Sequence, residues 1–172
     1  MKRLASEFFD CNSVELAPKL LGKVLCVQTE SAIIRKAITE TEAYCQNDTA
    51  CHGNKGRTKR NDPMFHPGGT VYVYLCYGMH EMFNVAAGRD GESQAVLVRG
   101  IEGYAGPGKV TKHMNIDRSF NYEFLPASNR IWIENGVEVH ESQIEKLKRV
   151  GIGYAARCDQ DRLWRFRLVI SS

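Results

Sequence analysis

Three β-rich runs follow one another between residues 70 and 101, and only short turns separate them. TVYVYLCY covers residues 70–77 and ends at Gly78, HEMFNVAA covers 80–87, and QAVLVRGI covers 94–101 after the turn GRDGES. Strands joined by turns this short pair in an antiparallel way, because a parallel pair needs a long crossover. The pattern therefore predicts a hairpin followed by a third strand, all in one antiparallel sheet.

The rest of the chain adds further strands and a few helices. With 172 residues, 43% of them hydrophobic, the chain can build one core and is not typical of a disordered protein. We therefore expect an α+β fold, a single domain over residues 1–172 around a curved, mostly antiparallel β-sheet with flanking helices. Further strands are expected over 23–30, 33–44, 129–134 and 163–170. Helices are expected over 13–21, with Ser13 as N-cap, over 143–149, and briefly within 114–121, whereas 52–69 and 103–110 are expected to be loops.

The strand over residues 33–44 carries the first chemical signal. Simple alternation places Glu42 and Tyr44 on the same face, with Glu40 two residues earlier and Ile34, Lys36 and Ile38 in line with them. A β-bulge would break this alternation. A carboxylate beside an aromatic ring suits general base catalysis, although two glutamates on a strand are, by themselves, more typical of an exposed surface.

A cluster of cations follows in the long loop. Lys55, Arg57, Lys59 and Arg60 fall within six residues, with no acid before Asp62. Such a cluster is typical either of a solvated loop or of a site that binds phosphates. The formal net charge of +3 is compatible with nucleic acid but does not imply it.

The six cysteines form no CxxC pair, and no secretory signal or apolar run of roughly 20 residues is present. We therefore expect free thiols and no membrane association. Cys45, Cys51, His52 and Cys76 are an alternative set of metal ligands, but their spacing is not that of a usual zinc site. We expect no metal.

Motifs along nearly the whole chain carry a family resemblance. They are SEFF, LLGKVL, ITETEAY, NDPMF, VYVYLCYGMHEMFNV, AVLVRG, GPGKV, IDRSF, GIGYA and WRF. With these motifs the chain resembles the alkyladenine (3-methyladenine) DNA glycosylases, which excise alkylated and deaminated purines. The resemblance implies a mixed domain around a curved antiparallel sheet, a protruding hairpin that inserts into the DNA minor groove, and no cofactor.

The resemblance also implies catalytic residues. Glu42, in ETEAY, would be the general base for the water that attacks C1′, and as an anion it would stabilise an oxocarbenium-like sugar. Arg99 would help to hold that water near the sugar and phosphate, the alternative being a structural salt bridge at a strand end. No lysine is placed as a nucleophile, so a monofunctional hydrolase without a lyase step is expected.

The expected base pocket is aromatic. Tyr44 and His52 would stack on opposite faces of the extruded base, and Tyr74 would meet its edge. The small residue Ala50, shortly before His52, would also belong to the pocket. Asn84 would exclude guanine by crowding its exocyclic amine. We expect Tyr72, on the same face as Tyr74, to belong to the core.

Residues outside the pocket would hold the DNA. Tyr77, at the hairpin tip, would fill the gap left by the extruded nucleotide. Phosphate contacts are expected from Arg57, Lys59, Arg60, Lys109 and Lys112.

The chain departs from the family pattern in two places. The loop between Cys45 and Cys51 is about one residue shorter than in some relatives, which makes the assignment of His52 less secure. The segment GIEGYA after Arg99 is short where many members carry a helical insertion. This difference is expected to weaken duplex affinity or to shift the substrate range.

The sequence therefore predicts a DNA glycosylase of base-excision repair that flips damaged purines, namely 3-methyladenine, other alkylpurines, and hypoxanthine or ethenoadenine. Its expected partner is double-stranded DNA, and we expect it to act as a monomer in the bacterial cytoplasm, or in the nucleus of a eukaryote. Two alternatives stay open: a damage-sensing module in which Glu42 is dispensable, and an RNA-binding or RNA-modifying domain with the same basic, aromatic surface.

Overall fold

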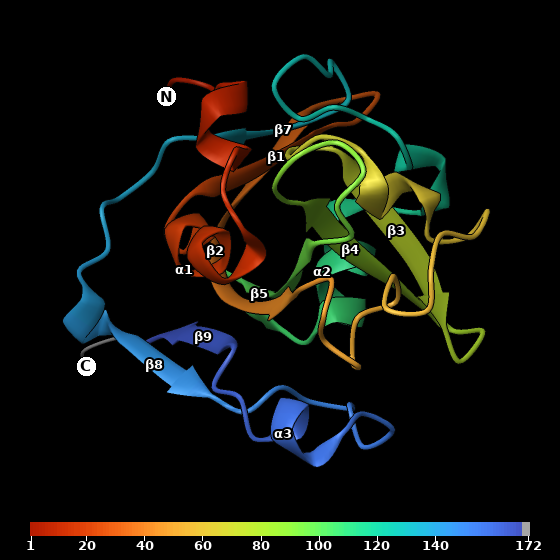
Figure 1. The fold of residues 1–172 in the computed structure, drawn as a ribbon. Helices are drawn as coiled ribbons and strands as arrows, with labels where there is room; N and C mark the ends of the chain where they lie inside the picture. Colours follow the sequence, from red (N-terminus) through yellow and green to blue (C-terminus); the bar gives the residue numbers. More distant parts are fainter. Residues whose placement is uncertain (170–172) are drawn as a thin grey trace.

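The computed structural model describes residues 1–169, and its centre is an antiparallel sheet that curls around one side of the molecule (Figure 1). Within the described residues the main strand order is β3-β4-β5-β2-β1-β7, with β6 paired to β5 and the β8–β9 hairpin joined to β2 through β9. The strands are β1 (Val24–Gln28), β2 (Ile33–Tyr44), β3 (Val71–Cys76), β4 (His80–Ala86), β5 (Ala95–Ile101), β6 (Tyr104–Ala105), β7 (Ile131–Glu134), β8 (Ile144–Leu147) and β9 (Arg165–Leu168).

Few helices flank this sheet, and most are a single turn or two. They are α1 (Ser13–Leu20), α2 (Pro107–Met114) and α3 (Arg157–Gln160), with 3₁₀ turns η1 (Ser6–Phe9), η2 (Asp62–Phe65), η3 (Arg118–Phe120) and η4 (Glu141–Gln143). The predicted α+β class is confirmed, as are the predicted meander and the strands near 23–30, 33–44, 129–134 and 163–170. Ile170, the last residue of that final predicted strand, lies outside the described residues.

Two local predictions are wrong for identifiable reasons. Residues 143–149 are rich in good helix formers, but they form η4 and β8, because β8 pairs along its length with β9 and Glu145 binds Arg167 across the pair. Residues 103–110 contain glycine and proline, yet they form β6 and the start of α2. Pro107 stands in the first turn of α2, where its missing N–H costs nothing.

The N-cap of α1 is also one residue earlier than predicted. The side chain of Asn12 accepts the cap hydrogen bond from the Glu15 amide. The hydroxyl of Ser13 instead donates to the Tyr44 carbonyl over 2.9 Å. Helix α1 is therefore hydrogen-bonded to the end of β2, next to Glu42 and Tyr44.

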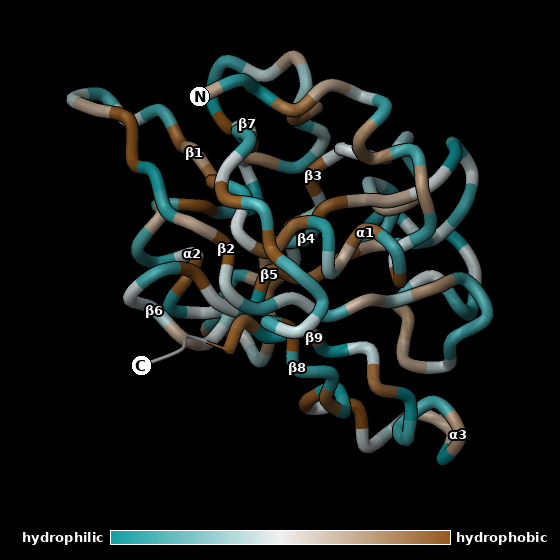
Figure 2. Tube along the Cα trace, turned by 90° about the vertical axis from the view of Figure 1, so that its left-hand side faces the viewer, coloured by the Kyte–Doolittle hydropathy of each residue, from teal (hydrophilic) through white to brown (hydrophobic). Residues whose placement is uncertain are grey.

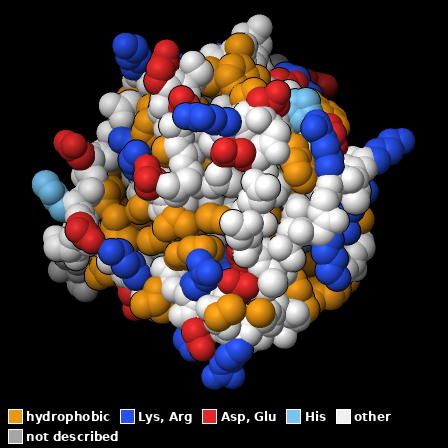
Figure 3. All heavy atoms as spheres, in the orientation of Figure 1, with side chains coloured by type: hydrophobic (Ala, Val, Ile, Leu, Met, Phe, Trp, Pro, Cys, Tyr) orange, Lys and Arg blue, Asp and Glu red, His pale blue; other side chains and the backbone are white. Residues whose placement is uncertain are grey.

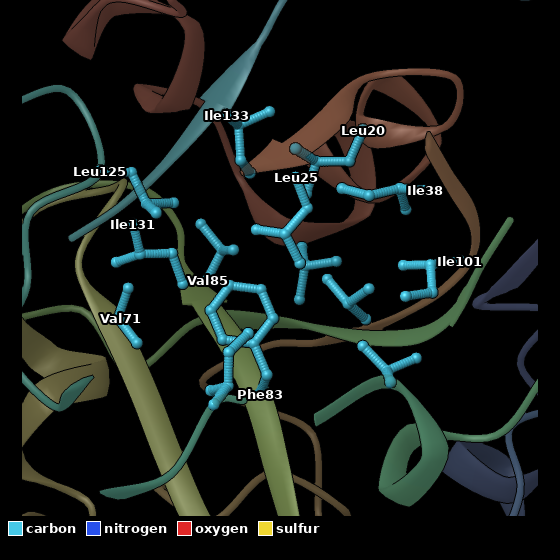
Figure 4. Close-up of a cluster of buried hydrophobic side chains, with 14 of the residues drawn as sticks. Leu20, Leu25, Ile38, Val71, Phe83, Val85, Ile101, Leu125, Ile131 and Ile133 are labelled. Atoms are coloured by element: carbon cyan, nitrogen blue, oxygen red, sulfur yellow. The ribbon is translucent and has the colours of Figure 1, made fainter. Parts of the chain in front are cut away.

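The hydrophobic core lies against the sheet and is covered by α1 and α2. Leu20, Leu25, Ile38, Phe83 and Ile101 are among its fully or nearly fully buried members (Figure 4). Figure 2 shows hydrophobic residues along the central strand β5, whereas the outer loops are mostly hydrophilic.

Two β-bulges interrupt the pairing of β2 with β5. Ile38 pairs with Ile101 and Glu40 with Gly100, so Thr39 is an extra residue in β2. Thr41 then pairs with Val98, so Arg99 is an extra residue in β5. A bulge redirects side chains and is common beside active sites.

The bulge at Thr39 corrects the predicted faces of β2. Ile38 lies in the core together with Ala43, and the Thr41 hydroxyl donates to the carbonyl of Ala17 in α1. Glu40, Glu42 and Tyr44 therefore share a face, as predicted, but it is not the face of Ile38.

Candidate active site

A cavity of about 370 Å³ opens beside the β3–β4 hairpin, and its wall brings together residues that are far apart in the sequence. Every predicted pocket residue lies on this wall, as do Arg99 and Tyr77. Arg60 is the only one of the five predicted phosphate-binding cations that contributes to it. The predicted residues on the wall are Tyr44, Ala50, His52, Arg60, Tyr74, Tyr77, Asn84 and Arg99.

Glu42 lies directly behind that wall, with its side chain fully buried. Its Oε2 accepts a hydrogen bond of 2.7 Å from the Tyr44 hydroxyl, and its Oε1 accepts one of 2.8 Å from the Val150 amide. Nη1 of Arg99 is 3.5 Å from the same Oε1. Tyr44, Arg99 and Val150 all line the cavity, so the carboxylate is held at its inner end by three cavity residues.

Burial raises the pKa of the Glu42 carboxyl above its usual value. The charge of Arg99 opposes this shift most strongly, followed by the hydrogen bonds from Tyr44 and Val150. A carboxylate whose pKa is raised towards the working pH is a better proton acceptor. Burial and the neighbouring carboxylate also raise the pKa of Tyr44 well above its usual value, so its hydroxyl stays protonated and donates to Glu42.

Arg99 reaches this site because it is the bulged residue of β5. Its guanidinium lies between two carboxylates, with Nε 3.7 Å from Oε1 of Glu40 and Nη1 3.5 Å from Oε1 of Glu42. Among the described residues the buried Nε of Arg99 makes no hydrogen bond. Both contacts are therefore looser than a direct hydrogen-bonded ion pair.

His52 meets the aromatic side of the cavity. Its ring packs edge-on against Tyr74, with centroids 4.4 Å apart and an angle of 65° between planes. Its Nδ1 is 3.0 Å from the hydroxyl of Tyr72. Tyr72 is buried, as predicted, but it also orients the histidine, which the sequence alone did not indicate. Partial desolvation in the cavity wall, and then the charge of Arg60, lower the pKa of His52 and favour the neutral ring.

Asn84 is buried in β4 at the cavity wall. Its amide nitrogen donates to the carbonyls of Tyr72 and Met82, each over 3.2 Å. These bonds to the backbone fix the amide while leaving Asn84 on the cavity surface.

A buried ion pair supports the site from behind. Arg149 and Asp48 are both almost completely buried, and Nη2 of Arg149 donates to Oδ1 of Asp48 over 2.9 Å. The guanidinium also lies 4.8 Å from the centre of the Tyr44 ring and donates to the Ala43 carbonyl over 2.9 Å. The pair therefore fixes Tyr44 and the adjacent Val150, whose amide binds Glu42.

Sequence reasoning missed the third side of the cavity. Val150, Ile152 and Tyr154 line it, and the Tyr154 hydroxyl donates to the Ala50 carbonyl over 2.8 Å. The motif GIGYA was a signal for this segment, but a backbone donor such as the Val150 amide leaves no trace in the residue type.

Tyr77 stands at the tip of the β3–β4 hairpin. It is 91% exposed, and the neighbouring Met79 is 73% exposed. Tyr77 has φ of 50° and Gly78 has φ of 66°, as in the turns that favour glycine at both positions. The hairpin thus presents an aromatic ring to solvent at the rim of the cavity.

The five predicted phosphate-binding cations are all exposed, but two have partners within the protein. Arg57 binds Asp62 over 2.5 Å, and Arg60 donates to the Leu75 carbonyl over 2.9 Å. Lys59, Lys109 and Lys112 are exposed on the loop and on α2. Figure 3 shows Lys and Arg side chains gathered along the right-hand edge of the molecule, where Figure 1 places the loop between β2 and η2.

Over residues 1–169, no three His, Cys, Asp or Glu side chains are grouped closely enough to hold a metal ion. In this part of the chain every cysteine is a free thiol, including Cys45, Cys51 and Cys76. In the same part of the chain, no helix is long and apolar enough to cross a membrane.

Comparison with known proteins gives a consistent result. A family model described as "Methylpurine-DNA glycosylase (MPG)" matches residues 7–105 and 103–171. The chain is 36% identical to "DNA-3-methyladenine glycosylase" of Arabidopsis thaliana, with 96% of this chain and 71% of the relative covered. It is 38% identical to a protein of Borreliella afzelii, with 92% of each chain covered. It is also 38% identical to one of Methanocella arvoryzae, with 96% of this chain and 92% of the relative covered. The last two carry the name "Putative 3-methyladenine DNA glycosylase".

Proposed function

Since the chain belongs to the methylpurine-DNA glycosylase family and is a DNA glycosylase that hydrolyses N-glycosyl bonds, we propose how it does so. The protein flips one damaged purine into the cavity and releases it with a water molecule that Glu42 activates. The observation that carries the proposal is the environment of Glu42. A fully buried carboxylate is held by Tyr44, Val150 and Arg99, all of which line a cavity wide enough for one base.

In the proposed reaction, the oxygen of water bonds to C1′ of the sugar while the bond between C1′ and the purine nitrogen breaks. Glu42 takes a proton from the water, and the purine leaves with the electrons of the broken bond. A cationic alkylpurine leaves as a neutral base, whereas a neutral purine must also gain a proton. Arg99 would orient the water and lie near the sugar-phosphate, since it lines the cavity and its Nη1 is 3.5 Å from Glu42.

We propose that the aromatic walls select the base. Tyr44 and His52 would enclose its two faces, with Tyr74 at its edge. A neutral His52, favoured by its lowered pKa, does not repel a cationic purine. Asn84, held by two backbone carbonyls, would form a rigid wall that leaves no room for the amine of guanine.

The surface around the cavity suits double-stranded DNA. Tyr77 would fill the space left by the flipped nucleotide, replacing part of the lost stacking. Lys59, Lys109 and Lys112 would contact phosphates, and Arg57 and Arg60 would do so while also bracing the loop. We propose a monomer, because one cavity serves one nucleotide.

The proposed enzyme has no lyase step. Within the described residues, the cavity lining includes no lysine that could form a Schiff base with the sugar. The abasic product would keep an intact backbone. The damaged purines proposed as substrates are 3-methyladenine, other alkylpurines, hypoxanthine and ethenoadenine.

The test compares wild type with Glu42→Gln on alkylated DNA and on duplexes that contain hypoxanthine or 1,N6-ethenoadenine. Glu145→Gln is a matched control, since this half-exposed carboxylate pairs with Arg167 away from the cavity. We expect release by wild type and the control, and loss of about 100-fold or more in Glu42→Gln. Unchanged release in Glu42→Gln refutes the base assignment, and binding without release by wild type favours a damage-sensing module.

A further inference from the structure

Arg99 is shared between two carboxylates. Its Nε is 3.7 Å from Glu40 and its Nη1 is 3.5 Å from Glu42. In a closed arginine–carboxylate pair the nitrogen and oxygen are about 2.7–2.9 Å apart. The guanidinium is thus in contact with the catalytic carboxylate without being closed upon it, and Glu40 provides the competing attraction.

A second arginine holds Glu40 in place. Nη1 of Arg165 in β9 donates to Oε1 of Glu40 over 2.9 Å, and Nε of Arg165 donates to the Lys148 carbonyl over 2.7 Å. The charges therefore alternate across three strands, from Arg165 through Glu40 and Arg99 to Glu42. The side chains of Glu40, Arg99 and Arg165 are at most 19% exposed, so water and salt screen these contacts only in part.

The backbone is shaped around this array. The bulges at Thr39 and Arg99 bring Glu40 and Arg99 together. Gly100 lies directly beside them, and a Cβ at this position would be 3.1 Å from the Cβ of Glu40 and 2.9 Å from the Thr39 hydroxyl. A side chain at residue 100 would therefore displace Glu40.

We propose that Glu40 is a positioning residue that, anchored by Arg165, holds Arg99 back from Glu42 and so leaves a lone pair of the catalytic carboxylate free to accept a proton. The inference rests on the proposed function, in which Glu42 is the general base. Without the charge of Glu40, Arg99 closes on Glu42, occupies a lone pair and weakens the base. Without Arg165, Glu40 draws Arg99 to itself, and Glu42 loses its nearest cation.

These two changes have opposite effects on the protonation of Glu42. A closer cation stabilises the carboxylate and lowers its pKa, and a more distant cation raises it. The other groups around Glu42 are unchanged by either substitution and do not reverse this order. They are the cation Arg149 and the hydroxyls of Tyr44, Tyr74 and Tyr154.

The experiment measures single-turnover release of ethenoadenine against pH for wild type, Glu40→Gln and Arg165→Met. We expect the acid limb of Glu40→Gln to move down by about one pH unit and its plateau rate to fall about 10-fold. We expect the acid limb of Arg165→Met to move up. Glu141→Gln should match wild type, because Glu141 pairs with Lys146 at the exposed surface, outside the array.

Controls separate positioning from folding. Lesion-duplex affinity should stay within about 3-fold of wild type in both variants, since neither removes a cavity-lining group. Glu40→Asp, which keeps the charge, should restore most of the wild-type pH profile. The proposal is overturned if the acid limbs of Glu40→Gln and Arg165→Met stay at the wild-type pH. It is also overturned if both acid limbs move in the same direction.

The arms also separate this inference from the proposed function. If Glu42→Gln still releases the purine, Glu42 is not the general base and the proposed function is wrong. If Glu42→Gln is inactive while Glu40→Gln keeps the wild-type rate and profile, only the role of Glu40 fails.

Discussion

The hydroxyl of Tyr44 donates a 2.7 Å hydrogen bond to Oε2 of Glu42, two residues earlier on the same strand. The proposed stacking ring and the proposed general base are therefore joined directly by a hydrogen bond. Any movement of the ring against a bound purine is transmitted to the carboxylate, which links recognition to chemistry.

Tyr44→Phe separates these two roles, because phenylalanine keeps the ring and loses the hydroxyl. A hydrogen bond to a charged group contributes about 1.5–3 kcal/mol, so we expect single-turnover release to fall about 10- to 100-fold. Lesion-duplex affinity should stay near wild type, as measured by fluorescence anisotropy. Equal losses in Tyr44→Phe and Tyr44→Ala would show that the hydroxyl adds nothing beyond the ring.

Glu42→Gln should stabilise the fold at alkaline pH while abolishing activity. The folded-state pKa of Glu42 is raised above 4.5, so the folded protein binds this proton more tightly than the unfolded chain. The resulting stabilisation is complete below the unfolded pKa and is lost as pH rises through the folded value. Thermal unfolding at pH 8 should therefore show a higher Tm for Glu42→Gln than for wild type, with the gap closing towards pH 4. A constant gap at all pH values would contradict the raised pKa.

Protonation of His52 should weaken the processing of cationic purines. Its pKa is lowered from 6.5 by partial desolvation in the cavity wall and then by Arg60, so the neutral ring persists below that pH and becomes cationic only as pH falls through the lowered value. Arg60→Gln removes one of these causes, and we expect the fall in 3-methyladenine release to begin at higher pH. NMR titration of the His52 ring provides the direct measurement, and an unchanged midpoint would exclude the influence of Arg60.

Tyr77→Asn should stabilise the hairpin and impair function. Tyr77 is 91% exposed with φ of 50°, a conformation that asparagine tolerates better than tyrosine. We expect the free energy of unfolding to rise by up to about 1 kcal/mol, while affinity for lesion duplexes falls about 10-fold or more. Lesion affinity equal to wild type would disprove the role of Tyr77 in holding the flipped state.

Arg149→Met should destabilise the protein strongly, because it leaves Asp48 buried and unpaired. Breaking a buried pair in this way costs about 3–5 kcal/mol. Urea unfolding measures this loss, and Lys148→Met is the control, since Lys148 pairs with Asp161 at the exposed surface. A loss below about 1 kcal/mol in Arg149→Met would contradict the cost expected of an unpaired buried carboxylate.

Much of the site could be predicted because its residues lie in the motifs that carry the family resemblance. Glu42 and Tyr44 follow the alternation of β2, and the glycine after Tyr77 marks the turn. The roles of these residues remain predictions, but their convergence on one cavity is an observed feature of the fold.

The missed parts depend on contacts that no local pattern encodes. The bulge that brings Arg99 to Glu40 is visible only once β2 and β5 are paired. Residues 144–147 have helical preferences, but β9 pairs with them and makes them a strand. Arg149 was expected in a helix, whereas its ion pair with Asp48 joins residues 101 positions apart.

The hydrogen bond from the Val150 amide to Glu42 spans 108 residues of chain. Contacts of such long range tend to form late when a protein folds, because closing a large loop costs entropy. In a refolding experiment, the local β3–β4 hairpin should therefore form before base release returns. The recovery of catalysis would then report the folding step in which the Val150 segment docks against β2.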